Sequence, residues 1–428
     1  MSAISTMAMQ KTGKLSGYTV SCLVGLICLA SMQAPAVALE YSQDNHTFEF
    51  GSRGRLANVD ANTHSKAASL LLRLHVESEW SSHFSTLLEV DHVELGWKDE
   101  FSNGVHFNGN PVIPDAQGSD LNQVLIRYAP ANTWQLTLGR EAVNLGNQRF
   151  VGTNGFWQNQ QTLDTLGFKY EFGVASHVLY RYVDNVNRIN GDHAGKYLSP
   201  SDSNFVEQNG IRPASFLGDH DHNTHLVFAQ FKEWDYSQIQ VYYFDMDIKE
   251  AAALSNQTLG ARYQFKGRWH TLRTQAHGEI ALQTRTEINN NRTLSFYDIG
   301  AGVGYHSHEV SLNYQHLGAS NGASFVTPLA SLHEKNGWVD KFLLTPSTGL
   351  RDYSLQYIWR SSPFKLDARY HAFYSDRHNT AIGEELDMDL IFKFNRENSL
   401  LFRYAEFKTR TDSRPNEQRL FLMFTHNL

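Results

Sequence analysis

Hydrophobic and polar residues alternate along most of the chain beyond residue 46. In the stretch 70–80, leucine, valine and tryptophan fill most even positions, while arginine, histidine and two glutamates lie at odd positions. The stretches 364–374 and 385–394 alternate in the same way. Because successive side chains of a strand point to opposite faces, each stretch predicts a strand with one apolar and one charged face.

Segments of this kind, each about ten residues long, predict eighteen strands, an even number like that of bacterial outer-membrane barrels. They cover 47–56, 68–80, 83–95, 120–129, 133–143, 162–171, 174–183, 222–232, 236–247, 255–266, 269–283, 294–305, 308–318, 351–360, 363–375, 383–394, 398–408 and 418–427. Several links have only two or three residues, whereas 96–119, 144–161, 184–221 and 319–350 are long. Short turns at one end and long loops at the other are typical of outer-membrane barrels.

Aromatic residues end many of these segments, among them Trp80, Trp134, Trp234, Trp269 and Trp359. Aromatic girdles at the two membrane interfaces would place them there. The sequence therefore predicts an all-β fold, a transmembrane antiparallel β-barrel of about 18 strands. The alternative is a soluble sandwich or propeller, whose polar face would meet bulk water.

The N-terminus has the pattern of a secretory signal peptide. Lys11 and Lys14 precede an apolar run, 20–30, and the small residues Ala36 and Ala38 follow it. We expect cleavage after Ala38, which leaves 39–428 as one barrel domain. The alternative, an uncleaved anchor helix, is disfavoured because a membrane span needs about 20 apolar residues.

Composition narrows the function further. Both cysteines, Cys22 and Cys28, lie in the signal, so the mature chain uses no disulfide. Without the two signal lysines the chain has 35 basic and 44 acidic residues, a net charge of −9. This balance argues against nucleic acid as a partner. A mean hydropathy of −0.42 is too polar for a helical membrane protein.

The segment 139–164 is polar and contains several glycines between two predicted strands. Eight asparagines and glutamines surround Arg140 and Arg149 in it. Amides donate and accept hydrogen bonds, and arginine binds carboxylates with a rigid fork. The segment therefore predicts a site for hydroxyl-rich or acidic solutes, with both arginines away from the regular wall.

Charged residues also lie on the predicted inner face. The basic ones are Arg73, Arg127, Arg181, Arg262, Arg273, Arg369 and Arg403. The acidic ones are Glu77, Glu79, Glu89, Asp91, Asp298, Asp367, Asp387 and Asp389. They predict either ion pairs that stiffen the wall or a basic ladder for anions, and for any single residue we favour the ion pair.

His220, His222 and His225 lie beside two aspartates and resemble a metal cluster. Spacing alone is weak evidence for metal, and the end of a long loop is polar in any case. We therefore predict no metal site and no cofactor. No nucleophile, metalloprotease or phosphate-loop motif occurs, so we predict no enzyme, although scattered catalytic residues would escape a reading of the sequence.

Two ordered blocks resemble the alginate-export family of outer-membrane porins. The first contains Gly139-Arg140, Asn147 to Gly152 and Trp157 to Asp164; the second contains Phe325 to His333, Asn336 to Leu343 and Thr345-Pro346. The resemblance implies a monomeric eighteen-stranded barrel with an arginine-rich conduit for polysaccharide or small anions. Matched onto this chain, the conduit candidates are Arg140, Gln148, Arg149 and Gln158, to which the wall adds Arg127 and Arg369. Two features depart from the pattern, because the chain ends in Leu428 rather than an aromatic residue and is acidic overall.

The second block contains Trp338, Phe342 and Leu343, which need cover from water. We therefore expect the stretch 325–350 to fold against the barrel wall as a constriction or lid. The lumen would then be partly occupied by in-folded loops.

Together these features predict a passive channel in the outer membrane of a Gram-negative bacterium. Its solutes would be hydrophilic, either oligo- or polysaccharides such as alginate or small organic anions. Its other partners would be outer-membrane lipid and the barrel-insertion machinery. The alternative is a surface enzyme or adhesin that the barrel anchors through its long loops, among them 184–221 with its histidines.

Overall fold

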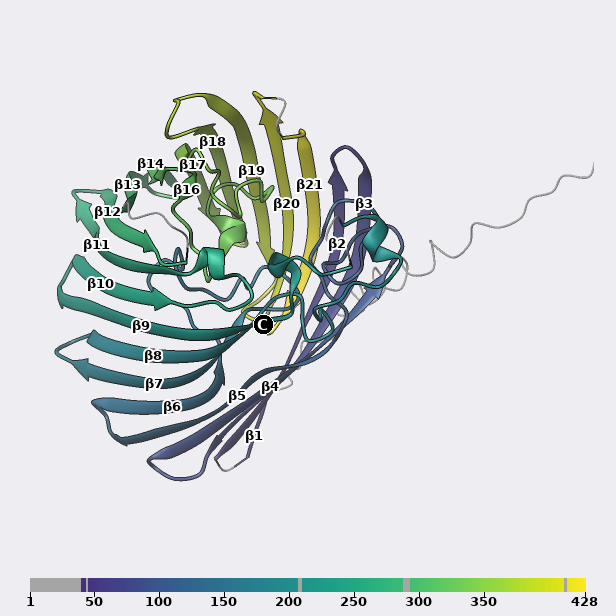
Figure 1. Cartoon of the computed structure of the whole chain (residues 1–428). Helices are drawn as coiled ribbons and strands as arrows, with labels where there is room; N and C mark the ends of the chain where they lie inside the picture. The colour runs from purple at the N-terminus through teal and green to yellow at the C-terminus, as the bar shows by residue number, and fades with distance from the viewer. Residues whose placement is uncertain (1–39, 44, 207–209, 288–292, 412–413) are drawn as a thin grey trace, which may run out of the picture. The chain divides into compact units, whose positions relative to one another are not determined.

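Eighteen strands form a closed wall in the computed structural model, which describes residues 40–428 except 44, 207–209, 288–292 and 412–413 (Figure 1). The wall strands are β2 (His46–Asp60), β3 (His64–Glu79), β4 (Phe84–Gly96), β5 (Gly118–Ala131), β6 (Trp134–Glu141), β7 (Thr162–Phe172), β8 (Ser176–Asn187), β9 (Asp219–Trp234), β10 (Ser237–Met246), β11 (Asn256–Trp269), β12 (Leu272–Arg285), β13 (Leu294–Tyr305), β14 (His308–Leu317), β17 (Leu350–Ser361), β18 (Phe364–Tyr374), β19 (Ala381–Lys393), β20 (Asn398–Thr409) and β21 (Glu417–His426). The predicted signal peptide, 1–38, lies outside the described residues.

Every predicted segment overlaps one wall strand, so the barrel and its strand number are confirmed. Three short strands were not predicted: β1 (Glu40–Gln43), which pairs with the start of β2, and β15 (Ala319–Ser320) and β16 (Ala323–Ser324), which pair with each other. Strands of two to four residues are too short to show an alternating pattern.

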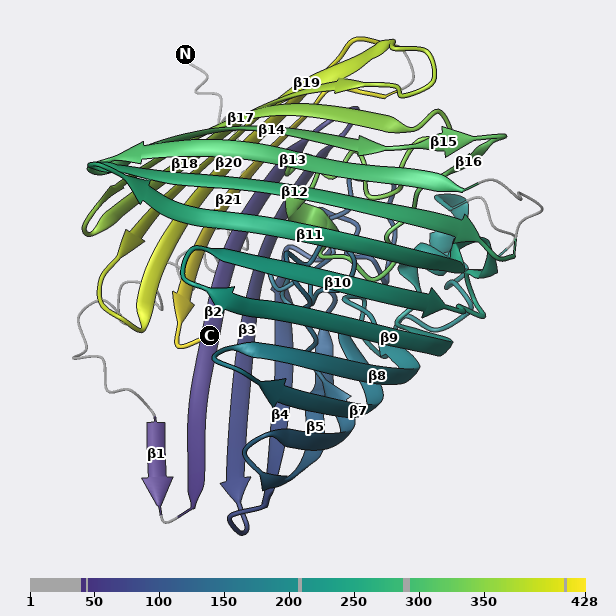
Figure 2. The same ribbon diagram turned by 90° about the vertical axis from the view of Figure 1, so that its left-hand side faces the viewer.

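Antiparallel pairing closes the wall, because β21 returns to β2 with His426 opposite Ser52. Neighbouring strands lie side by side around the wall (Figure 2). A closed single sheet rules out the sandwich alternative. We call the end with the links 80–83, 235–236, 270–271 and 306–307 the short-turn end, and the opposite end the long-loop end.

The outer face of the wall is apolar. Leu138, Ile299 and Leu312 are 60%, 56% and 65% exposed there. Exposed Trp80 and Trp269 lie at the short-turn end, and exposed Tyr243, Tyr353 and Tyr370 lie in the other half of their strands. This is the arrangement of an apolar band between two aromatic girdles.

The inside of the barrel holds folded loops (Figure 1). We call residues 142–161, between β6 and β7, the first inner loop, and residues 325–349, before β17, the second inner loop. Val151 of the first and Leu329 of the second are fully buried and belong to one apolar cluster with inward wall residues such as Phe296. The predicted in-folding of loops is therefore confirmed.

Four 3-10 helices of three residues each lie in the loops: η1 (Asp202–Asn204), η2 (Ala214–Phe216), η3 (Ala252–Leu254) and η4 (Leu332–Glu334). Among the described residues, no helix has the length and apolar character needed to cross a membrane.

Candidate solute conduit

The two inner loops are joined by hydrogen bonds. The Gly152 amide donates to the Leu329 carbonyl at 2.9 Å, and the Ser331 amide donates to the Gln148 carbonyl at 3.1 Å. Lys335 Nζ donates to the Asn147 carbonyl at 2.6 Å. The loops therefore narrow the lumen as one unit.

Gln148 and Arg149 lie in this junction. Gln148 has a positive φ of 60°, and its Oε1 accepts a hydrogen bond from Ser331 Oγ at 2.9 Å. Arg149 is 1% exposed, and its Nη2 donates to Asn336 Oδ1 at 2.8 Å. Burial lowers the pKa of Arg149 to about 10. The geometry gives Arg149 the role of tying the first inner loop to the second.

Gln158 is buried and lies near the C-terminal end of the first inner loop. Its Nε2 donates to Ser69 Oγ at 2.8 Å, and its backbone amide donates to Asp115 Oδ1 at 3.3 Å. Asp115 also binds Arg55 Nη1 at 2.6 Å. These contacts hold the loop on β2 and β3, and the 1% exposure of Gln158 leaves little surface for a solute.

Arg140 lies on the wall, which corrects the expectation that the polar segment moves it away. Strand β6 continues through Arg140 to Glu141, and Arg140 Nε binds Asp164 Oδ1 on β7 at 2.8 Å. Its Nη1 also donates to the Leu121 carbonyl. Polar composition shows where a strand weakens but does not show at which residue it ends. Arg149, in contrast, does leave the wall.

The wall candidates Arg127 and Arg369 are more open. Arg127 binds Glu77 Oε1 at 2.7 Å with 30% of its side chain exposed, and Arg369 binds Asp367 Oδ1 at 3.2 Å with 27% exposed. Of the seven inward arginines, six form ion pairs, and Arg273 donates to two carbonyls instead. The wall-stiffening interpretation therefore holds for these six.

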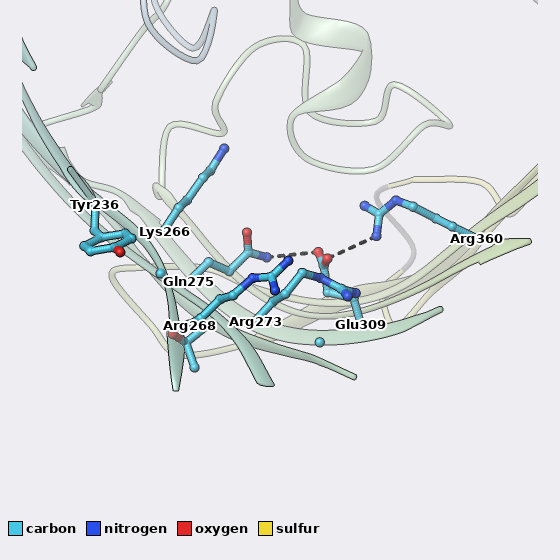
Figure 3. A pocket seen from close by; sticks show the side chains of 10 residues that line it. Tyr236, Lys266, Arg268, Arg273, Gln275, Glu309 and Arg360 are labelled. Atoms are coloured by element: carbon cyan, nitrogen blue, oxygen red, sulfur yellow. Dashed lines mark hydrogen bonds and ion pairs between the residues drawn. The ribbon is translucent and has the colours of Figure 1, made fainter. Parts of the chain in front are cut away.

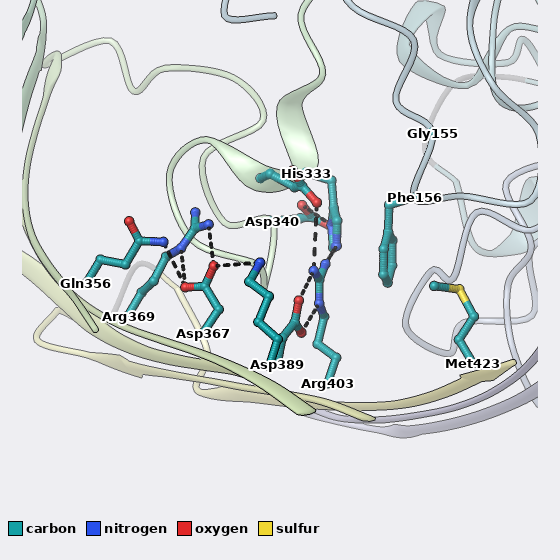
Figure 4. Close-up of polar contacts among 12 residues, drawn as sticks. Gly155, Phe156, His333, Asp340, Gln356, Asp367, Arg369, Asp389, Arg403 and Met423 are labelled. Carbon is teal, nitrogen blue, oxygen red and sulfur yellow. Dashed lines mark hydrogen bonds and ion pairs between the residues drawn. The ribbon is translucent and has the colours of Figure 1, made fainter. Parts of the chain in front are cut away.

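Arg403 on β20 connects both inner loops to the wall (Figure 4). Its Nε and Nη2 donate to the two oxygens of Asp389, each at 2.7 Å, and its Nη1 contacts His333 Nε2 at 2.8 Å. The guanidinium lies between the rings of Phe156 and Trp338, 4.3 and 4.0 Å from their centroids. Sequence reasoning named Arg403 only as an inward cation, because its partners lie far away in the chain.

The second inner loop is covered as predicted, with one exception. Trp338 and Phe342 are 2% and 5% exposed, and Phe342 packs against Phe373 of the wall at 4.5 Å. Leu343, expected to be covered, is 44% exposed. Phe342 packs inward, whereas Leu343 and Leu344 after it are exposed, a difference that their shared apolar character does not predict.

An opening inside the wall lies at the short-turn end and has a volume of about 590 Å³ (Figure 3). We call it the basic vestibule. Its charged lining residues are Lys266, Arg268, Arg273, Arg360 and Glu309. Glu309 accepts hydrogen bonds from Gln275 and Arg360, both at 3.1 Å. The side chains of Lys266 and Arg268 are exposed and form no ion pair with any described residue.

Glycines on β13 make room for this lining. A Cβ at Gly304 would lie 2.8 Å from Arg273 Nη2, and one at Gly302 would lie 3.0 Å from Gln275 Nε2. Both long side chains can therefore lie flat against the wall. Sequence reasoning missed the vestibule, although Lys266 and Arg268 stand two apart near the end of β11, on the face of Arg262.

The three histidines at the start of β9 do not converge. His220 Nε2 contacts the Ala214 carbonyl at 2.8 Å, and His222 Nδ1 contacts Thr224 Oγ1 at 3.0 Å. His225 contacts the hydroxyl of Tyr180 instead. Within the described part of the chain, no group of three or more possible ligands could hold a metal ion.

Three solved structures share this architecture. OccK9 (OpdG) of Pseudomonas aeruginosa is 13% identical with a TM-score of 0.67, over 90% of this chain and 98% of that chain. OccAB2 of Acinetobacter baumannii is 14% identical with a TM-score of 0.66, over 89% and 98%. The outer membrane protein opdK of Pseudomonas aeruginosa is 10% identical with a TM-score of 0.61, over 90% and 99%.

No protein-family model matches the sequence, and no curated protein matches it. At such low identities the structural matches establish the fold alone. The chain is an eighteen-stranded antiparallel barrel with the same fold as these solved structures.

Proposed function

We propose that the protein is a passive channel in the outer membrane of a Gram-negative bacterium and that it favours anionic hydrophilic solutes. The basic vestibule carries the proposal, since four cationic side chains face one carboxylate inside a closed wall. Eighteen strands enclose a lumen wide enough for water where loops leave it open. The apolar outer face supports the membrane location, and the channel acts as a monomer inserted by the barrel machinery.

The solute class follows from the same lining. Free guanidinium and ammonium groups suit carboxylates, and nearby amides such as Gln275 suit hydroxyl groups. Small organic acids and acidic oligosaccharides, including alginate fragments, combine these groups. The resemblance to the alginate-export family supports acidic oligosaccharides as solutes. That solute class remains a prediction.

Neutralising the vestibule should lower anion preference. In planar bilayers with a salt gradient, we expect the double variant Lys266→Gln, Arg268→Gln to shift the reversal potential toward zero, because two unpaired cations leave the conduit. The matched control is Lys249→Gln, which removes an exposed cation beyond β10 at the long-loop end. Equal shifts for both variants would show that the vestibule does not select ions. The absence of any ion current from the wild type would remove the channel proposal.

A liposome-swelling panel identifies the solute. Vesicles containing the protein are placed in neutral sugars, uronate oligomers and small organic acids of similar size. We expect faster swelling with the acids than with neutral sugars of the same size. Equal rates across the panel would leave a channel without anion preference.

Lys335 should make selectivity depend on pH. Burial lowers the pKa of Lys335 to about 8, whereas the unfolded value is near 10.5. Raising the pH from 7 to 9 therefore removes most of its positive charge, and anion preference should fall over this step. In Lys335→Met the same step should change anion preference less than in the wild type, because the charge that Lys335 loses is already absent. A wild-type profile that is flat from pH 7 to 9 would contradict this role.

A further inference from the structure

A serine, a histidine and a glutamate lie together on the outer face of the wall, near the long-loop end of β4 and β5. His92 and Ser119 are directly opposite each other in the ladder, and His92 Nδ1 contacts Ser119 Oγ at 2.7 Å. Glu94 follows His92 by two residues, so both point outward, and its Oε2 lies 3.9 Å from His92 Nε2. None of these residues belongs to the conduit.

The chemistry of the three residues matches the order of a hydrolytic triad. The Glu94 carboxylate faces Nε2 across 3.9 Å, longer than a hydrogen bond, and attracts the imidazole proton to that nitrogen electrostatically. The lone pair of Nδ1 then remains free to accept the hydroxyl proton of the serine, which is the role of a general base. Glu94 is itself held in place, because Gln117 Nε2 donates to it at 2.9 Å and Lys98 Nζ lies 3.2 Å away.

The position on the wall indicates the substrate. Val90 and Leu121, which are opposite each other one step further from the rim, are 37% and 39% exposed and belong to the apolar band. The side chains of His92 and Glu94 are 47% and 53% exposed. In the proposed membrane setting the three residues therefore lie where the acyl chains end and the polar headgroups begin.

We propose that Ser119, His92 and Glu94 form a catalytic triad that hydrolyses acyl esters of outer-leaflet lipids. Ser119 Oγ attacks the ester carbonyl carbon while its proton passes to His92. The bond from carbonyl carbon to alcohol oxygen breaks, and the lipid alcohol leaves with that proton. Water, deprotonated by His92, then releases the fatty acid from Ser119 and restores the hydroxyl. The sum is hydrolysis, with water as the only co-reactant.

A second serine–histidine contact provides an internal control. His46 Nδ1 and Ser78 Oγ are 2.9 Å apart between β2 and β3. Ser78 is 7% exposed, and His46 forms no ion pair with a carboxylate of the described residues. This pair has the same hydrogen bond without the third member or the open serine. Ser78→Ala should therefore leave hydrolysis unchanged.

The test measures fatty-acid release by the purified full chain. One arm uses mixed micelles of phosphatidylethanolamine and phosphatidylglycerol, and the other uses lipopolysaccharide, which separates the two sources of acyl esters. We expect release in one arm, lowered at least ~100-fold by Ser119→Ala or His92→Gln and about 10-fold by Glu94→Gln. Channel conductance should stay at the wild-type level in Ser119→Ala, so that this proposal and the channel proposal can fail separately.

Covalent labelling provides a second readout. A fluorophosphonate probe should add one label to the wild type and to Ser78→Ala, measured as intact mass, and none to Ser119→Ala. Equal fatty-acid release by the wild type and Ser119→Ala would overturn the triad. So would a wild type that neither releases fatty acid in either arm nor takes the label.

Discussion

Replacing Gly337 by alanine should release the second inner loop from the wall and raise the single-channel conductance severalfold. Gly337 has a φ of +82°, and an added Cβ would lie 2.4 Å from Glu385 Oε2. Glu385 is 1% exposed and accepts the Val339 amide at 2.7 Å, so it cannot move aside without losing that contact. The strained backbone alone costs about 1–3 kcal/mol. Planar-bilayer recordings of the variant and the wild type provide the comparison.

Gly322 provides the matched control in the same connection between β14 and β17. It has a φ of +79°, but an added Cβ would meet no atom within 4 Å. Gly322→Ala therefore carries the same backbone strain without the contact to the wall, and its conductance should remain near the wild-type value. If Gly337→Ala also conducted like the wild type, the second inner loop would not set the width of the channel.

Replacing Arg403 by alanine should strongly destabilise the barrel interior. The change leaves Asp389, 7% exposed, without its two-pronged partner and removes the cation between Phe156 and Trp338. Removing one partner of a buried ion pair costs about 3–5 kcal/mol, because the other charge stays buried. We expect a clear fall in the melting temperature in detergent, followed by circular dichroism, and noisier channel currents as both inner loops loosen.

Arg410, which directly follows β20, forms an arginine–carboxylate ion pair on the surface and so serves as the control for Arg403. Its Nη2 binds Glu384 at 3.0 Å, but 60% of its side chain is exposed. Exposed ion pairs contribute about 0–1 kcal/mol, so Arg410→Ala should melt close to the wild type. Arg403→Lys should recover part of the loss, since it keeps the charge without the fork. Equal melting of the two alanine variants would contradict the role of Arg403.

The wall could be predicted because its signal is local. Each of the eighteen segments alternates over about ten residues, and a membrane barrel needs one apolar and one polar face on every strand. The prediction was weakest where this alternation stops. Arg140 lies on the wall because β6 extends three residues into the polar segment 139–164. Leu343 is exposed although it is apolar like Trp338 and Phe342.

The candidate site was only partly accessible to such reasoning. The polar first inner loop was found from its amides, yet Arg149 binds Asn336, 187 residues further along, and is thereby buried. The basic vestibule joins residues of several strands, from Lys266 on β11 to Arg360 on β17. Ser119 and His92 are 27 residues apart and meet only through the ladder of β4 and β5.

The sequence by itself determined that this chain builds a closed barrel with an apolar outer face and a charged inner face. It also determined that a long loop with apolar residues folds against the wall. The alternation that carries this information is repeated within each strand and needs no partner to be visible. Only the tertiary structure decided which arginines form ion pairs and which line the basic vestibule without a carboxylate partner. That depends on partners from distant strands and loops, whose register and folding place each charge either in contact or in the open.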